Sequence, residues 1–327
     1  MSEGLYTGPT EDTLRPVVKK EEVIYEAHPD KKRQTYSFDE ALDYFQKGKE
    51  IADHFEIGQR EATWIPRAEF PDLPIALLLA SDIHFGSIRV DYEMLKQHLD
   101  IVENTPNFFI ATNGDHADMF NAANGKIATG MTEDPLPPQI QARTFMEKFI
   151  ELDRKSKVAV MSHGNHDDFG FVGGQDFYDS FLGEMSCPIF TTGGILNVMV
   201  EGQLYRIVMN HTYWGKSKLN VTNAAKRLIE YEGGGDVDIG WVGHTHQSSY
   251  EHFERGMKDI IAVVSGTYKI DDYYAAKKGI GGRGQRPGIC VMLWPGERRM
   301  QAFKDVEVAH DYLKALIFLK EEKGKCK

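Results

Sequence analysis

Residues Leu73–Gly86 read Leu-Pro-Ile-Ala-Leu-Leu-Leu-Ala-Ser-Asp-Ile-His-Phe-Gly, and the rest of the fold is predicted outward from them. The apolar run Ile75–Ala80 is typical of a strand that is buried on both faces of a sheet. The run stops at Asp82 and His84, two metal-ligand residue types separated by one position. Residues two apart in an extended segment point to the same side, so this pair can share one cation. Taken alone, such a pair is more often an ordinary turn than a metal site.

Strands and helices are predicted to alternate after this first strand. Apolar runs indicate strands, and apolar residues at helical spacing indicate the helices between them. The expected helices are Tyr92–Val102, Ile140–Leu152 and Val306–Leu319. The expected strands are Phe108–Ala111, Val158–Met161, Leu204–Met209, Val237–Val242, Ile260–Val264, Ile289–Leu293 and Arg299–Phe303. Alternation of this kind predicts an α/β sandwich.

The N-terminal part differs from the rest in composition. We expect residues 1–70 to form a polar tail with a short helical region, and residues 71–327 to form the main domain. Ser37–Glu40 has the form of a capping box that opens a helix. With Gly48 as a break, a second short helix at Ile51–Phe55 would make this region similar to the first half of a helix-turn-helix. A helical pair packed on the main domain is favoured over DNA binding.

Overall composition places the chain among globular proteins. Its 327 residues are 41% hydrophobic and 27% charged, with no apolar run of 18 residues that could span a bilayer. The polar N-terminus lacks the apolar core of a secretion signal. The three cysteines have no paired spacing, which favours a reducing compartment. The sequence therefore predicts a cytoplasmic protein with no membrane partner.

The net charge bears on possible partners. A value of −11 speaks against binding long nucleic acid by charge alone. It does not exclude phosphate substrates, because bound divalent cations invert the local field.

Five of the predicted strands end in polar clusters. These clusters supply Asp82 and His84; Asp115 and Asp118; Asn165, His166 and Asp167; His211; and His244 with His246. Ligands of α/β sheets collect beyond the carboxyl ends of the strands, so clusters far apart in sequence can converge. Mixed imidazole and carboxylate ligands suit manganese, iron or zinc better than magnesium or calcium. Seven such ligands with one shared carboxylate are too many for one ion and suit two.

The order of the blocks is Asp-x-His, Gly-Asp-x-x-Asp, Gly-Asn-His-Asp, a single His and Gly-His-x-His. This order resembles the calcineurin-like dinuclear metallophosphoesterase superfamily, and the blocks span Asp82–His246, about half of the chain. The resemblance implies a four-layer α/β/β/α sandwich of two mixed sheets flanked by helices. It implies a phosphoester hydrolase that uses two divalent metal ions and a metal-activated hydroxide. Manganese is the expected metal, with iron, zinc and nickel as alternatives.

The resemblance also implies a role for each matching residue. One metal would be held by Asp82, His84, Asp115 and His246, and the second by Asp115, Asn165, His211 and His244. A bridging anion at Asp115 is physically reasonable, because it screens two cations held roughly 3.5–4 Å apart. His166 would face the substrate and protonate or stabilise the leaving group, with Asp118 orienting its ring. Asp167 is expected behind the ligands, and for His116 the sequence leaves open whether it faces the substrate.

The resemblance leaves the substrate open. Protein phosphatases of this superfamily extend the second block to Gly-Asp-x-x-Asp-Arg-Gly and use Gly-Asn-His-Glu, whereas this chain has Asp118-Met-Phe120 and ends the third block in Asp167. The lipid-precursor pyrophosphatase branch usually lacks the histidine after Asn165. A phosphodiesterase or nuclease acting on nucleotides or nucleic acid is therefore favoured. The alternatives are a phosphomonoesterase acting on small molecules or proteins, and a non-catalytic metal-bearing binding module.

One stretch is expected to bind the substrate. Its basic residues Lys277, Lys278, Arg283 and Arg286 alternate with glycines and can contact phosphate, and Tyr268 can stack on a base. A solvated loop without function is an equal alternative. The arrangement is also similar to phage and prophage members of the superfamily, which would place a phage-encoded enzyme in the host cytoplasm. The sequence leaves the oligomeric state open.

Overall fold

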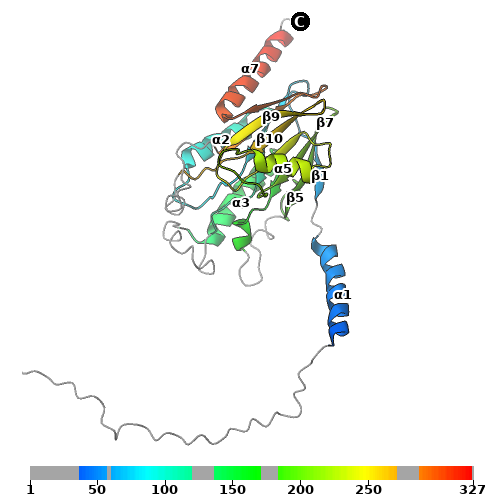
Figure 1. Cartoon of the computed structure of the whole chain (residues 1–327). Helices are drawn as coiled ribbons and strands as arrows, with labels where there is room; N and C mark the ends of the chain where they lie inside the picture. Colours follow the sequence, from blue (N-terminus) through cyan, green and yellow to red (C-terminus); the bar gives the residue numbers. More distant parts are fainter. Residues whose placement is uncertain (1–36, 57–59, 120–135, 171–182, 271–286, 326–327) are drawn as a thin grey trace, which may run out of the picture. The chain divides into compact units, whose positions relative to one another are not determined.

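The computed structural model describes residues 37–56, 60–119, 136–170, 183–270 and 287–325 (Figure 1). The chain divides into two compact units, Met1–Glu56 and Ile57–Lys327. In the part of the chain that the structure describes, no helix is long and apolar enough to cross a bilayer.

The described residues of the first unit, 37–56, contain one helix, α1 (Phe38–Glu56). Its start is a capping box, as expected: the amide of Ser37 donates to the Glu40 carboxylate at 2.8 Å, and the amide of Glu40 donates to the Ser37 hydroxyl at 3.2 Å. The helix continues through Gly48, so the prediction of two short helices was wrong. A glycine inside a helix costs only about 1 kcal/mol relative to alanine, which the residues on either side can offset. The described residues therefore do not form the first half of a helix-turn-helix.

The boundary between the units also lies earlier than residue 70. Strand β1 (Glu61–Trp64) pairs in parallel with β6 (Gly194–Val200) and so belongs to a sheet of the second unit. The ring of Trp64 packs against Phe109, with centroids 5.1 Å apart. Ala62 and Trp64 point inward because side chains two apart on a strand share a face.

Two mixed sheets of six strands form the second unit. The first has the order β1-β6-β7-β8-β10-β9 and the second the order β12-β11-β2-β3-β4-β5. The remaining strands of the first sheet are β7 (Gln203–Asn210), β8 (Ile239–Val242), β9 (Ser249–Arg255) and β10 (Lys258–Val264). The second sheet consists of β2 (Ile75–Ala80), β3 (Phe108–Asn113), β4 (Val158–Ser162), β5 (Ile189–Phe190), β11 (Gly288–Leu293) and β12 (Met300–Phe303).

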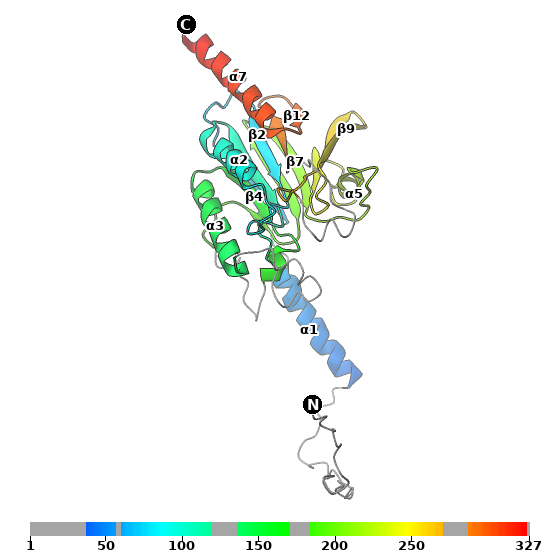
Figure 2. The same cartoon turned by 90° about the vertical axis from the view of Figure 1, so that its left-hand side faces the viewer.

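Helices cover the outer faces of both sheets. Against the second sheet pack α2 (Tyr92–Asn104), α3 (Pro138–Arg154) and the first half of α7 (Val306–Lys325). Against the first sheet packs α5 (Asn223–Tyr231). Figure 2 shows α2 and α3 on one side of the paired sheets and α5 on the other. This is the four-layer α/β/β/α sandwich that the sequence predicted.

Strand β2 shows why its sequence is a continuous apolar run. Leu78 packs toward the helices, whereas Leu77 and Leu79 pack between the two sheets. All six side chains of β2 are buried. Burying a leucine contributes about 1.5–3 kcal/mol, so both faces of this strand stabilise the sandwich.

The sandwich brings the carboxyl ends of two sets of parallel strands together. In the second sheet β2, β3 and β4 are parallel, and in the first sheet β7, β8 and β10 are parallel. The two sets meet where the Asn113 side-chain amide donates to the carbonyl of Asn210 at 3.1 Å. The polar loops that follow these strands therefore lie at one edge of the molecule's core.

Candidate metal centre

The loops at this edge hold their backbone in an unusual conformation. Asp82, His84, Asp115, His244 and His246 all have positive φ, between 52° and 65°. For a residue other than glycine, a left-handed backbone costs about 1–3 kcal/mol and persists only where the surroundings enforce it. Such strain clusters at functional sites, and here it falls on residues predicted to bind metal.

Main-chain hydrogen bonds enforce this conformation. The amide of Asp82 donates to the carbonyl of Gly114 at 3.1 Å, and the amide of His84 donates to the carbonyl of Asp115 at 3.0 Å. The loops after β2 and β3 thus run side by side. These main-chain hydrogen bonds alone bring Asp82, His84 and Asp115 close together.

Two motif glycines allow close approach of the loops. A Cβ atom on Gly164 would lie 2.4 Å from the amide nitrogen and from Oδ1 of Asp115. A Cβ atom on Gly243 would lie 2.0 Å from the hydroxyl of Ser81 and 2.8 Å from Oδ2 of Asp82. Both positions require glycine because atoms of a neighbouring loop occupy the space that a Cβ atom would need.

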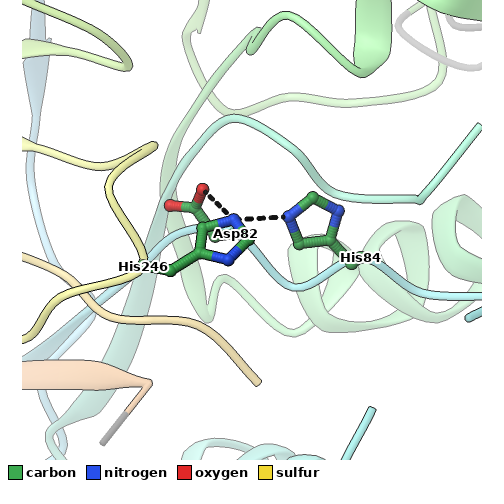
Figure 3. Close-up of side chains that lie close together, drawn as sticks. All are labelled: Asp82, His84 and His246. Atoms are coloured by element: carbon green, nitrogen blue, oxygen red, sulfur yellow. Dashed lines mark hydrogen bonds and ion pairs between the residues drawn. The ribbon is translucent and has the colours of Figure 1, made fainter. Parts of the chain in front are cut away.

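The first cluster consists of Asp82, His84 and His246 (Figure 3). Nε2 of His84 lies 3.0 Å from Nε2 of His246, which lies 3.3 Å from Oδ1 of Asp82. Oδ2 of Asp82 accepts hydrogen bonds from the Ser81 hydroxyl and the His244 amide at 2.7 and 2.8 Å. Oδ1 is buried, and among the residues placed by the structure it has no hydrogen-bond partner. An uncompensated buried oxygen facing two imidazole nitrogens fits a bound cation.

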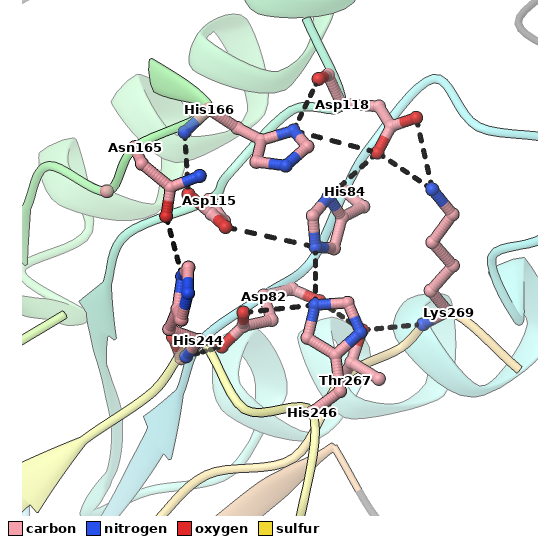
Figure 4. A network of polar contacts seen from close by, with 12 residues as sticks. Asp82, His84, Asp115, Asp118, Asn165, His166, His244, His246, Thr267 and Lys269 are labelled. Atoms are coloured by element: carbon pink, nitrogen blue, oxygen red, sulfur yellow. Dashed lines mark hydrogen bonds and ion pairs between the residues drawn. The ribbon is translucent and has the colours of Figure 1, made fainter. Parts of the chain in front are cut away.

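The second cluster consists of Asp115, His211 and His244 (Figure 4 shows its Asp115 and His244). Nδ1 of His211 donates to the carbonyl of Asn113 at 2.6 Å, which leaves Nε2 as the ligand atom, 3.2 Å from Oδ2 of Asp115. This buried Nε2 has no hydrogen-bond partner within the described ranges. Oδ1 of Asn165 lies 2.6 Å from Nδ1 of His244.

Asp115 lies between the two clusters. Its Oδ2 is 3.2 Å from Nε2 of His211 and 4.0 Å from Nε2 of His84. The structure brings together all seven predicted ligands: Asp82, His84, Asp115, Asn165, His211, His244 and His246. Their donor set of imidazole, carboxylate and amide atoms fits two divalent cations. Their individual roles as ligands stay a prediction.

Charges within the cluster shift the pKa values of its members. Burial opposes ionisation of Asp115, but the nearby His211 and His166 hold its pKa well below the usual value. Burial alone would lower the pKa of His211, yet the Asp115 carboxylate raises it to about 10. Burial and the charge of Lys216 lower the pKa of His244 to about 4. Imidazoles bind metal only when neutral, so a cation here would replace the proton on His211.

His166, the predicted catalytic acid, is held differently from the expectation. Its Nδ1 donates to the main-chain carbonyl of Asp118 at 2.6 Å, whereas the Asp118 carboxylate lies 3.9 Å away. The main-chain amide of His166 donates to Oδ1 of Asp115 at 2.8 Å. The main-chain carbonyl of Asp118 is therefore the nearer partner of His166, and the role of the Asp118 carboxylate in orienting the ring stays a prediction.

The Asp118 carboxylate instead contacts His84 and Lys269 (Figure 4). Its Oδ1 lies 2.8 Å from Nδ1 of His84, and the Lys269 ammonium donates to Oδ1 and Oδ2 at 3.0 and 3.2 Å. Lys269 was not among the site residues predicted from the sequence. A signal was present, because Ser265–Lys269 is a sixth polar cluster at the carboxyl end of a strand, β10. Thr267 in the same cluster donates to the carbonyl of Asp82 at 2.7 Å.

Asp167 supports the loops from behind, as expected. Its carboxylate accepts hydrogen bonds from the amides of Gly164, Asp115 and His116 at 2.8, 3.0 and 3.1 Å. Burial opposes its ionisation, but His116 lowers its pKa to about 2. His116 itself is only 1% exposed and contacts Thr112 and Asp167. This burial decides against a substrate-facing role for His116.

Of the predicted substrate-binding residues, Tyr268 is the one that the structure describes. Tyr268 is only 2% exposed, and its hydroxyl lies 2.8 Å from Nδ1 of His98, so the prediction that it stacks on a base was wrong. Its ring belongs to the core between the second sheet and its helices. Lys277, Lys278, Arg283 and Arg286 lie outside the described residues.

Comparison with known proteins identifies the family. Residues 75–248, more than half of the chain, match the calcineurin-like phosphoesterases, and the chain belongs to this family. The metallophosphoesterase superfamily predicted from the five sequence blocks is thereby confirmed. No curated protein sequence matched the chain.

Several solved structures are similar to the chain. Vacuolar Protein Sorting 29 from Cryptosporidium parvum has 14% identity and a TM-score of 0.37, with 72% of this chain and 100% of that chain covered. Vps29 from Chaetomium thermophilum has 10% identity and a TM-score of 0.33, covering 70% and 94%. The nuclease MPE from Pseudomonas putida has 11% identity and a TM-score of 0.31, covering 69% and 87%. Likeness of this extent says nothing about substrate.

Proposed function

We propose that the protein is a metal-dependent phosphodiesterase or nuclease that acts on nucleotides or nucleic acid. The observation that carries this proposal is the position of Asp115 between two clusters of buried ligand atoms. Two cations sharing one carboxylate are the arrangement used to stabilise both the attacking and the leaving oxygen of a phosphoryl displacement. The alternative of a non-catalytic binding module gives no reason for a histidine beside these clusters.

Each cluster would hold one divalent cation. Asp82, His84 and His246 would hold the first, and Asn165, His211 and His244 the second, with Asp115 shared. When bound, such ions act as Lewis acids on the phosphoryl oxygens and lower the pKa of water. The donor set favours manganese, iron or zinc among the possible metals, with nickel as a further alternative.

His166 would act on the leaving group. Its Nδ1 is engaged by the Asp118 carbonyl, so Nε2 is the ring nitrogen that would deliver a proton to the departing oxygen. The side chain is 14% exposed, whereas the side chains of His84 and Asp118 beside it are only 2% and 1% exposed. The greater exposure of His166 suits a residue that contacts the substrate, whereas His84 and Asp118 are enclosed by the protein.

The preference for diesters rests on the sequence blocks. The chain lacks the Arg-Gly extension of the second block and the glutamate of the third block that mark protein phosphatases. A phosphomonoesterase remains the second candidate. Nothing in the described residues favours it over the diesterase.

The test compares two chromogenic substrates on the purified full chain. We expect bis-p-nitrophenyl phosphate to be hydrolysed with a higher kcat/KM than p-nitrophenyl phosphate, and only after manganese, iron, zinc or nickel is added to chelator-treated protein. The variant His252→Ala serves as a control that should keep the activity of the wild type. His252 lies on β9 and pairs with Asp259, and it belongs to neither cluster of the candidate metal centre. A higher kcat/KM for the monoester would overturn the diesterase assignment. No turnover of either substrate with any of the four metals would overturn the hydrolase and support the binding module.

A further inference from the structure

Helix α1 carries its apolar residues on one side. Phe38, Leu42 and Phe45 are separated by four and three residues, so they share one face of the helix. The aromatic side chains here are open to solvent, with 78% of Phe38, 71% of Tyr44 and 69% of Phe45 exposed. Helices in proteins owe most of their stability to the packing of such a face, so this face requires a partner.

The charge of α1 limits what this partner can be. The helix carries six acidic residues and only two lysines, Lys47 and Lys49. Helices that lie on a membrane surface or on nucleic acid are rich in lysine and arginine, because both surfaces are negatively charged. An acidic amphipathic helix therefore favours an apolar protein surface as the partner.

The apolar positions of α1 are symmetric about the peptide bond between Gln46 and Lys47. Positions at equal distances from this centre hold residues of similar kind, and from the centre outward the pairs are Phe45 with Gly48, Leu42 with Ile51, Ala41 with Ala52, and Phe38 with Phe55. A two-fold interface requires that when one residue contacts a second residue of the other copy, the second contacts the first in return. Two antiparallel copies of α1 centred on this bond meet that requirement at every apolar position.

Gly48 fits the same arrangement. Glycine is unfavourable inside a helix relative to alanine, yet α1 continues through Gly48. In the antiparallel pair Gly48 lies opposite Phe45 of the second copy, and the missing side chain leaves room for that ring.

The charges of α1 favour the antiparallel orientation as well. The first half of the helix holds Asp39, Glu40 and Asp43 without a basic residue, and both lysines lie in the second half. An antiparallel pair places the acidic half of each copy beside the half with the lysines, whereas a parallel pair would align the two acidic halves.

We propose that α1 packs antiparallel against α1 of a second copy, so that the protein is a homodimer. At about 150–250 Å² per ring, the four aromatic residues of each helix raise the area buried in the pair to at most about 1,200–2,000 Å². This area reaches the size of a standard stable interface. The inference goes beyond the proposed function and does not depend on it.

The first experiment measures the mass of the purified full chain by sedimentation equilibrium. We expect twice the chain mass of 37.0 kDa for the wild type. Phe45→Glu places a charge at the centre of the interface and should raise the dissociation constant of the dimer by at least about 30-fold. Gln46→Glu adds the same charge on the polar side of the helix and should leave the dissociation constant unchanged. Thermal melting establishes that each variant is folded.

Two outcomes of this experiment would overturn the proposal. One is a wild-type chain that stays at the single-chain mass over the micromolar range. The other is a dimer that Phe45→Glu does not weaken, because the interface would then lie elsewhere on the chain.

Gly48→Leu tests the register of the pair. Leucine is a better helix former than glycine, so the substitution stabilises α1 as a single helix. In the proposed pair it fills the space opposite Phe45 of the second copy, and the dissociation constant should rise nevertheless. A dimer that becomes tighter would overturn the register.

Cross-linking tests the orientation in a Cys326→Ser background, in which the remaining Cys187 and Cys290 are buried. Ala41→Cys chains and Ala52→Cys chains are prepared separately, mixed, equilibrated and mildly oxidised. The antiparallel pair places these two positions opposite each other, so the mixture should form a disulfide-linked dimer and neither variant alone should do so. Cross-linking of either variant alone would show a parallel pair, and no cross-link in the mixture would exclude the proposed register.

Discussion

The ammonium group of Lys269 lies 3.0 Å from Oδ1 and 3.2 Å from Oδ2 of Asp118, with both side chains buried. The same carboxylate lies 2.8 Å from Nδ1 of His84, whose Nε2 faces His246. Lys269 follows β10 and Asp118 follows β3, so this pair ties the two sheets together at the site. It also fixes the ring nitrogen that His84 presents to a cation.

Replacing Lys269 tests this positioning role. Removing one partner of a buried ion pair leaves an uncompensated charge and costs about 3–5 kcal/mol, so Lys269→Met should lower the free energy of unfolding by about that amount. Because His84 loses its orientation, metal affinity should also fall by about 10-fold to 100-fold. Urea denaturation and titration calorimetry with manganese measure the two effects.

A matched control distinguishes the loss of a buried ion pair from the loss of an exposed one. Lys96→Met removes the ion pair with Asp100, whose side chains are 76% and 49% exposed. Exposed pairs contribute less than about 1 kcal/mol, so this variant should stay close to the wild type in stability and metal affinity. Equal losses in both variants would contradict the role given to Lys269.

Asp115→Asn tests the shared carboxylate. The amide preserves the shape of the side chain and can still accept the hydrogen bond from the His166 main chain, but it removes the negative charge between the two clusters. Since even outer partners of metal ligands are worth 10-fold to 100-fold in affinity, both sites should weaken by at least about tenfold. Metal content after dialysis, measured by mass spectrometry, checks this. Two ions retained at wild-type affinity would exclude Asp115 as the bridge.

His166→Ala tests whether His166 is an acid or a ligand. Both roles are compatible with the structure, because His166 also forms a group of potential ligands with His84 and Asp115. With Nδ1 committed to the Asp118 carbonyl, we expect turnover of bis-p-nitrophenyl phosphate to fall by about two orders of magnitude or more. Metal stoichiometry should stay at two ions. A parallel loss of one ion would mean that His166 is a ligand.

Elements with strong periodicity could be predicted from the sequence. Runs such as Ile75–Ala80 and Ile260–Val264 are apolar throughout because both faces of their strands are buried, so each appeared as a strand with little error. Strands β1, β5, β6 and β9 were missed. In β9 no residue is fully buried, and its sequence, Ser-Tyr-Glu-His-Phe-Glu-Arg, is mostly polar. Tertiary pairing with β10 makes it a strand, and a single sequence does not show such pairing.

The ligand types could be predicted at the site, but their supporting contacts could not. Asp, Asn and His at strand ends mark the two clusters because the fold brings strand ends together. Which acceptor lies nearer to Nδ1 of His166, the carbonyl of Asp118 at 2.6 Å or its carboxylate at 3.9 Å, depends on a difference of 1.3 Å. The sequence around Tyr268 has no apolar periodicity that would show whether its ring points into the core or toward the substrate. Packing against His98 decides this.

Glu103 provides a prediction on pH that is independent of the metal centre. It lies in the last turn of α2, and hydrogen bonds from Lys148 and Lys155 of the neighbouring α3 region lower its pKa to about 2. A carboxylate with a depressed folded-state pKa stabilises the protein above its unfolded value, near 4.5, and this stability is lost as the pH falls toward 2. Because the lysines are partly exposed, the contribution at pH 7 is about 1 kcal/mol.

Glu103→Gln should therefore destabilise the protein by about 1 kcal/mol at neutral pH and progressively less as the pH is lowered through the range between the two pKa values. Urea denaturation of the variant and the wild type at pH 7, 5 and 3 measures the difference. Glu147→Gln, which removes an exposed pair with Arg143, controls for the loss of an acidic side chain. If the Glu103→Gln difference grew toward acid, the carboxylate would have to be favoured in its protonated form in the folded protein. That would contradict the two lysine contacts, because an ammonium group stabilises only the ionised carboxylate.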